Sequence, residues 1–108
     1  MTTFNDRKRG EEAKFAYDQD TAFRIVARRN RLLGEWAADC LGLTDDQRTW
    51  YVREIVQADF EEPGDQDVIR RLLADFGEAG LTIDEAEVRE VLTAKSSEAE
   101  RAIISKEL

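Results

Sequence analysis

Four arginines within eight positions are the side chains of this sequence with the clearest capacity for chemistry: Arg24, Arg28, Arg29 and Arg31. A guanidinium group is always charged and presents five N–H donors, so it can bind phosphate or carboxylate oxygens in pairs. Trp36 follows on the same segment and adds an aromatic ring that attracts cations. Three interpretations stay open: binding of ATP or ADP near Trp36, binding of a protein partner, and charge balance with acidic residues of the chain itself.

Catalytic chemistry has little support, because the chain contains no histidine. Ser-His-Asp and Cys-His nucleophile pairs and the Glu-x-x-His ligands of a di-iron bundle are therefore excluded. The acidic run from Asp59 does not fit a calcium loop, since Pro63 and Arg70 would occupy positions that require oxygen ligands. No glycine-rich phosphate loop occurs. We expect no enzymatic activity, no metal and no cofactor, and any ATP or ADP binding to be weak.

Charge divides the chain into two parts. Residues 1–31 hold eight Lys and Arg against five Asp and Glu, whereas residues 32–108 hold eight against nineteen. A short cationic segment with aromatic residues ahead of an acidic body is typical of an arm that a partner orders. The acidic body disfavours nucleic acid and membrane surfaces, and no apolar run is long enough to cross a membrane. With Cys40 as the single cysteine, the sequence predicts a cytoplasmic protein without disulfides.

Hydrophobic periodicity predicts four helices, near residues 21–41, 45–60, 66–77 and 83–108. Each has an apolar stripe that it cannot bury alone, and the connections are short, so the expected fold is an all-α, small four-helix bundle over residues 20–108. The stripe of the first helix contains Phe23, Val26, Leu33, Ala37, Cys40 and Leu41. Arg24, Arg28 and Arg31 lie opposite that stripe.

Helix starts and large aromatics add local expectations. Thr44 with Gln47, and Thr82 with Glu85, have the spacing of capping boxes, and Asp65 is positioned to cap the third helix. Trp36 widens the apolar face of the first helix. Trp50 lies nearly opposite the apolar stripe of the second helix, so it is either exposed or closes the end of the bundle.

The N-terminal arm, residues 1–19, is expected to be mobile: disordered or partly helical when free. Phe4, Lys8, Glu11 and Phe15 would lie on one side of a helix, but Gly10 lowers helix propensity. Such a helix is marginal without a surface on which to pack.

Four blocks of the sequence carry a resemblance to a known family: MTTFNDR at 1–7, EAKFA at 12–16, ARRNRLLGEWAA at 27–38 and ADFEE at 58–62. They resemble the zeta subunit of alphaproteobacterial F-type ATP synthases, and the similarity covers essentially the whole chain. The resemblance implies a protein inhibitor of ATP hydrolysis. Its arm would enter a catalytic interface between the alpha and beta subunits, near the gamma subunit, and become helical there.

That resemblance also implies which residues of the arm contact the synthase: Phe4, Asn5, Arg7, Lys8, Glu11, Lys14 and Phe15. The protein would associate peripherally with the membrane-bound enzyme and be a monomer when free. Two other functions stay open: a bundle that senses ATP or ADP through Arg24, Arg28, Arg31 and Trp36, and an adaptor that binds proteins through Trp50 and its acidic faces.

Overall fold

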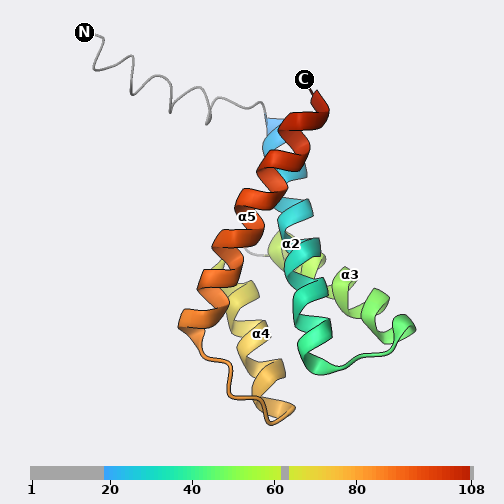
Figure 1. Ribbon diagram of the computed structural model, residues 1–108, viewed down its shortest axis with the longest axis vertical. Helices are drawn as coiled ribbons and strands as arrows, with labels where there is room; N and C mark the ends of the chain where they lie inside the picture. The colour runs from blue at the N-terminus through green and yellow to red at the C-terminus, as the bar shows by residue number, and fades with distance from the viewer. Residues whose placement is uncertain (1–18, 62–63, 108) are drawn as a thin grey trace, which may run out of the picture.

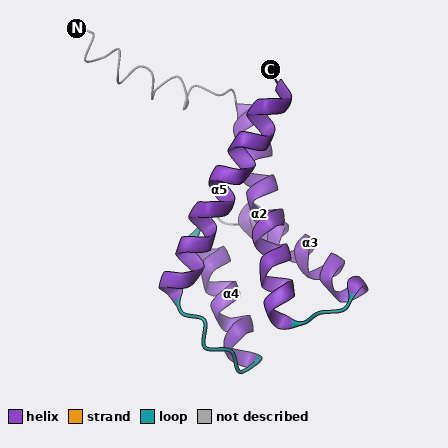
Figure 2. Ribbon diagram, in the orientation of Figure 1, coloured by secondary structure: helices purple, strands orange, loops and turns teal. Residues whose placement is uncertain are grey.

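The computed structural model describes residues 19–61 and 64–107, which form four α-helices (Figure 1). The helices are α2 (Gln19–Leu41), α3 (Asp45–Glu61), α4 (Gln66–Glu78) and α5 (Glu85–Glu107). No strand occurs among these residues (Figure 2). The predicted all-α fold and the position of every predicted helix are confirmed.

Helix α2 organises the bundle because it packs along both α3 and α5, while α4 contacts α3 and α5. In Figure 1, the first half of α2 and the second half of α5 run side by side beyond the other two helices. We call this two-helix part the stalk. The wider part, in which all four helices meet, contains the second half of α2. The stalk therefore lies where the chain leaves the arm, and the wider part lies at the opposite end of α2.

The core fills the wider part of the bundle. Its buried members are Leu33, Ala37, Ala38, Tyr51, Ile55, Val68, Ile69, Leu72, Phe76 and Val88. Ala99 and Ile103 are the buried apolar residues of the stalk. The predicted core position of Phe23 is wrong, because its side chain is 53% exposed. Phe23 lies near the start of α2, beyond the reach of α3 and α4, so only part of its ring can be covered.

The helix ends follow standard capping chemistry. Gly42 and Gly80 adopt positive φ after α2 and α4, and each allows two backbone N–H groups to bond back to the last turn. The Thr44–Gln47 capping box is confirmed: the Thr44 N–H donates to Gln47 Oε1 at 3.1 Å and the Gln47 N–H to Thr44 Oγ1 at 3.5 Å. These caps fix where α2 turns into α3 and where α4 stops.

Two predicted caps are wrong. Helix α5 begins at Glu85, and Asp84 caps it by accepting the Glu87 N–H at 2.9 Å, so Thr82 lies outside the helix. Asp65 occupies the N-cap position of α4 without a side-chain cap bond, because its carboxylate accepts a hydrogen bond from Arg29 instead. A long-range ion pair has replaced a local cap in the second case.

Helices α2 and α3 approach closely at Gly34. A Cβ atom at this position would lie 3.2 Å from Val52 Cα and 3.3 Å from Ile55 Cβ. Both distances are below ordinary van der Waals contact, so only glycine fits here without displacing α3.

Candidate partner-binding site

The arm residues that the resemblance implies as contacts all lie outside the described residues: Phe4, Asn5, Arg7, Lys8, Glu11, Lys14 and Phe15. The structure describes the base from which the arm leaves, the stalk. Helix α2 starts at Gln19, so the charges before this helix and those in its first half can be counted separately. Residues 1–18 contain four Lys and Arg and four Asp and Glu, whereas residues 19–31 contain four Arg and one Asp. The excess of positive charge belongs to α2 and not to the arm itself.

Three arginines, Arg24, Arg28 and Arg31, lie along one face of α2, which we call the arginine face. Arg24 Nε is 4.0 Å from Asp20 Oδ2, and Arg31 Nε is 3.8 Å from Glu35 Oε2. Both are i,i+4 pairs on exposed side chains, and such pairs contribute only about 0.2–1 kcal/mol. The Arg31 guanidinium can therefore exchange its own carboxylate for that of a partner at little cost.

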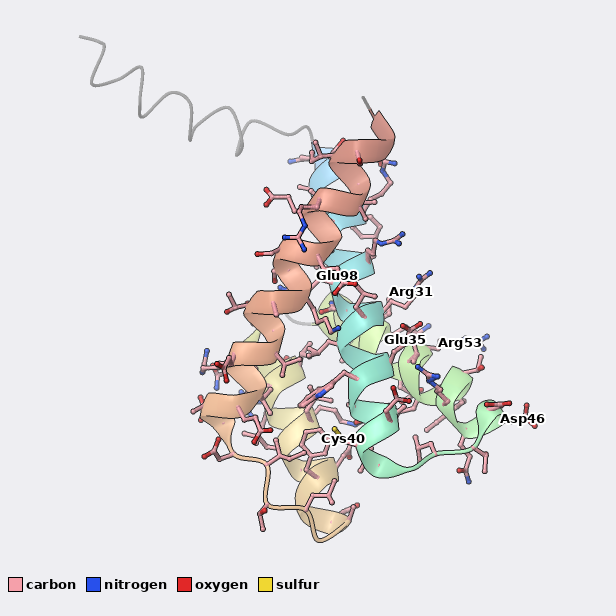
Figure 3. All side chains as sticks on the ribbon, in the orientation of Figure 1. Arg31, Glu35, Cys40, Asp46, Arg53 and Glu98 are labelled. Carbon is pink, nitrogen blue, oxygen red and sulfur yellow. The ribbon has the colours of Figure 1, made fainter. Side chains whose placement is uncertain are left out.

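Arg31 and Glu35 border a shallow hollow between α2 and α3. Arg48, Thr49 and Val52 complete its lining, and its volume is about 300 Å³. Figure 3 shows Arg31, Glu35 and Arg53 on the α3 side of α2. The hollow is mixed in charge, so it suits a single polar side chain better than a large anion.

Arg28 differs from its neighbours because it is half-buried. Its Nε atom is enclosed and has no hydrogen-bond partner among the described residues. An enclosed donor without an acceptor costs roughly 1–3 kcal/mol. Arg28 is thus the least satisfied cation of the arginine face.

Arg29, the fourth arginine of the cluster, points into the protein. Its side chain is 9% exposed, and Nη1 lies 2.9 Å from Asp65 Oδ1. Nε and Nη2 both donate to Asn30 Oδ1, at 3.0 and 2.8 Å, and Asn30 is fully buried. Arg29 therefore joins α2 to Asp65 at the start of α4, and Asn30 holds the Arg29 guanidinium in place, so this Arg-Asn pair has a structural role.

Trp36 is separated from the arginine face. Its ring meets Phe76 edge-on, with ring centroids 5.5 Å apart and an interplanar angle of 88°. Five residues of helix turn Trp36 by about 140° from Arg31. The structure thus brings Arg24, Arg28 and Arg31 onto one face and places Trp36 against α4. Binding of ATP or ADP by these four residues stays a prediction, and a single ligand would have to span both sides of α2.

A second polar cluster joins α3 to α4. The Tyr51 hydroxyl donates to Asp75 Oδ2 at 2.6 Å, and Arg71 Nε donates to the same oxygen at 2.9 Å. The Arg71 guanidinium also lies 5.5 Å from the centre of the Tyr51 ring and 3.7 Å from Glu54. Burial, followed by the bond to Asp75 and its charge, raises the pKa of Tyr51 well above its usual value, and Arg71 opposes this shift. No local spacing reveals this cluster because its members come from two helices.

The described residues show no other reactive centre. No group of three or more possible metal-binding side chains gathers within residues 19–61 and 64–107. Burial, with the negative charges of Glu87 and Asp39, raises the pKa of the Cys40 thiol, which keeps it protonated and unreactive. In this part of the chain, no helix is both long and apolar enough to cross a membrane.

Comparison with known proteins adds a family assignment to this geometry. A family model described as ATPase inhibitor subunit zeta matches residues 1–102. A protein whose structure was solved in solution by NMR is 41% identical, with a TM-score of 0.67, and the match covers 80% of this chain and 96% of that one. No curated protein matches the chain.

Proposed function

Because the chain belongs to the ATPase inhibitor subunit zeta family, we propose that it inhibits ATP hydrolysis by the F-type ATP synthase through its N-terminal arm. One observation carries the proposal: the family match begins at residue 1, so the arm is part of what the family shares. The role is inhibitory and not catalytic.

In the proposed mechanism, residues 1–19 become helical on entering the interface between the alpha and beta subunits, close to the gamma subunit. A helix of 19 residues is about 28 Å long, enough to reach deep into a subunit interface. Phe4 and Phe15 would anchor one side of this helix, while Arg7, Lys8 and Lys14 pair with carboxylates. The bound arm acts as a wedge that blocks the movements needed for hydrolysis, and its ordering costs part of the binding energy.

The bundle supports the arm in this mechanism. Helix α2 starts at Gln19, so an arm that becomes helical can extend α2 along one axis. Arg24 and Arg31 lie about 8 and 18 Å along α2 from that start. The arginine face would therefore follow the arm into the mouth of the interface and pair there with acidic residues of the synthase.

The same mechanism implies a place for the protein. It would be cytoplasmic, associate peripherally with the membrane-bound synthase, and be a monomer when free. It would need neither nucleic acid nor insertion into the membrane.

Nucleotide sensing is a separate candidate, favoured by the arginine face with its weakly paired Arg31 and, within the described residues, the unpaired Nε of Arg28. Titration of the protein with ATP and ADP, followed by backbone amide shifts, tests it. Shifts confined to residues around Arg28 would support nucleotide binding. No localised shift up to millimolar nucleotide would exclude it.

The inhibitor proposal is tested by ATP hydrolysis of the purified catalytic sector, titrated with arm variants of the full chain. Phe4→Ala and Phe15→Ala should each raise the half-inhibiting concentration by about tenfold or more, as expected for buried aromatic anchors. Ala13→Gln is the matched control, because position 13 is half a helical turn from the two phenylalanines and glutamine is also a good helix former. Equal inhibition by all three variants would contradict the proposed arm contacts.

A further inference from the structure

We propose that the groove between the start of α3 and the end of α4 binds a basic amphipathic helix of a protein partner. We call it the tryptophan groove. It lies at the end of the bundle opposite the stalk, where α2 ends, α3 begins and α4 ends (Figure 1). Its volume is about 730 Å³, and it is lined by Leu41, Leu43, Asp46, Gln47, Trp50, Tyr51, Arg71, Asp75, Glu78 and Ala79.

The apolar side chains that line the tryptophan groove favour a partner with apolar side chains. Trp50 is 57% exposed and is one of the two large apolar side chains with high exposure among the described residues. Leu41 and Leu43 pack on the core and present their remaining surface to the same groove. Trp50 belongs neither to the buried core nor to the partly buried residues packed against it. Exposed tryptophans flanked by leucines and a polar rim are typical of binding sites.

The charge of the groove calls for a positively charged occupant. Asp46, Asp75 and Glu78 line it against a single cation, Arg71. Arg71 is already neutralised by Asp75 at 2.9 Å and Glu54 at 3.7 Å. Neither Asp46 nor Glu78 forms an ion pair within the described residues, and Asp46 lies at the outer tip of α3 (Figure 3). Lysine or arginine side chains could pair with these two carboxylates and lie over the Trp50 ring.

The occupant should be helical because the walls of the groove are helices. Apart from the terminal turns, the backbone groups of α3 and α4 are paired within these helices, so the groove offers no strand edge to an extended segment. A helix satisfies its own backbone and can place apolar side chains on Trp50 and basic side chains on the rim.

The groove is fixed before binding. The capping box at Thr44 holds the start of α3, the turn at Gly80 holds the end of α4, and the Tyr51 to Asp75 bond ties the two helices together. A preformed groove loses little entropy when it binds. It also lies about 33 Å along α2 from Gln19, so a partner here would not compete with the arm.

The test is a titration of the full chain with an 18-residue amidated peptide of leucine and lysine, with leucines at helical spacing, followed by backbone amide shifts. Shifts should concentrate on Leu43, Trp50 and Ala79. Trp50→Ala should weaken binding about tenfold. Glu78→Gln should weaken it about threefold, and the matched control Glu90→Gln, on the exposed face of α5, should leave it unchanged.

Four results would overturn the proposal. The first is shifts spread over all acidic faces, with Glu90→Gln as damaging as Glu78→Gln. The second is equal binding of a peptide with glutamate in place of lysine. The third is the same localised shifts with spermidine, which would assign the groove to a small organic cation. The fourth is groove shifts that follow protein concentration alone, which would assign it to a second copy of this chain.

Discussion

Because α2 and α3 approach closely at Gly34, replacing this glycine with alanine should lower the free energy of unfolding. The same replacement at an open helical position should raise it. Gly34→Ala adds one methyl group at a helix crossing, 3.2 Å from Val52 Cα and 3.3 Å from Ile55 Cβ. Val52 Cα belongs to the backbone, so it cannot rotate away as the end of a side chain could. Helix α3 would have to move by several tenths of an ångström along the crossing.

The magnitude follows from two opposing terms. Replacement of a helical glycine by alanine stabilises by up to about 1 kcal/mol through backbone entropy. Overpacking by one methyl group costs roughly 1–3 kcal/mol. We therefore expect Gly34→Ala to lower the free energy of unfolding by about 1 kcal/mol.

Gly77 provides the matched control, because it is also helical and an added Cβ would meet no atom within 4 Å. Gly77→Ala should raise the free energy of unfolding by up to about 1 kcal/mol. Urea unfolding followed by far-ultraviolet circular dichroism measures both variants. If Gly34→Ala were as stabilising as Gly77→Ala, the reasoning about the helix crossing would be refuted.

Three further predictions concern polar contacts and the arm. Tyr51→Phe should cost about 1–2 kcal/mol at neutral pH, through the lost bond to Asp75. The pKa of Tyr51 is raised in the folded protein, so the contribution of its hydroxyl to the free energy of unfolding is complete below about pH 10 and falls at higher pH. In urea unfolding, the wild type should therefore lose more stability than Tyr51→Phe between about pH 9 and 11.5. Asp65→Ala should cost about 1–2 kcal/mol in the same assay, less than a fully buried pair with Arg29 because the Asp65 side chain is 44% exposed; a loss below about 0.3 kcal/mol would contradict this assignment. Gly10→Ala should lower the half-inhibiting concentration in ATP hydrolysis by up to about fivefold, and unchanged or weaker inhibition would count against a helical bound arm.

Helix positions were predictable from the sequence because amphipathic periodicity is a local property. The stripes containing Leu33, Ile55, Phe76 and Val88 all converge on one core, as four amphipathic helices must. The Thr44 capping box was equally local. The cap of α5 was misplaced by two residues because Thr82 and Asp84 offer competing signals, and the aspartate holds the first turn.

Predictions that depend on tertiary context were less successful. Asp65 is a good local cap, but the buried Arg29 needed an acceptor and bound it instead. Phe23 fits the apolar stripe by periodicity, although α3 and α4 do not extend to cover that end of α2. Periodicity placed Arg24, Arg28 and Arg31 on one face, but it could not reveal that the buried Arg29 pairs with Asp65. Periodicity states which face a residue occupies but not how far the neighbouring helices reach.

The candidate sites show the same difference between local features, which the sequence predicts, and features that depend on tertiary contacts. Only part of the tryptophan groove could be predicted from the sequence. The position of Trp50 away from the apolar stripe is a local feature, whereas Asp75 and Glu78 come from another helix. The arm residues could be proposed from spacing and resemblance, and they stay a prediction.

The most direct test of the inhibitor proposal is ATP hydrolysis by the purified catalytic sector, titrated with the full chain and with a protein lacking residues 1–19. Circular dichroism of the truncated protein first establishes that the bundle is folded. We expect the full chain to inhibit and the truncated protein not to inhibit. Inhibition of equal strength by the truncated protein, or no inhibition by a full chain that still binds the catalytic sector, would contradict it.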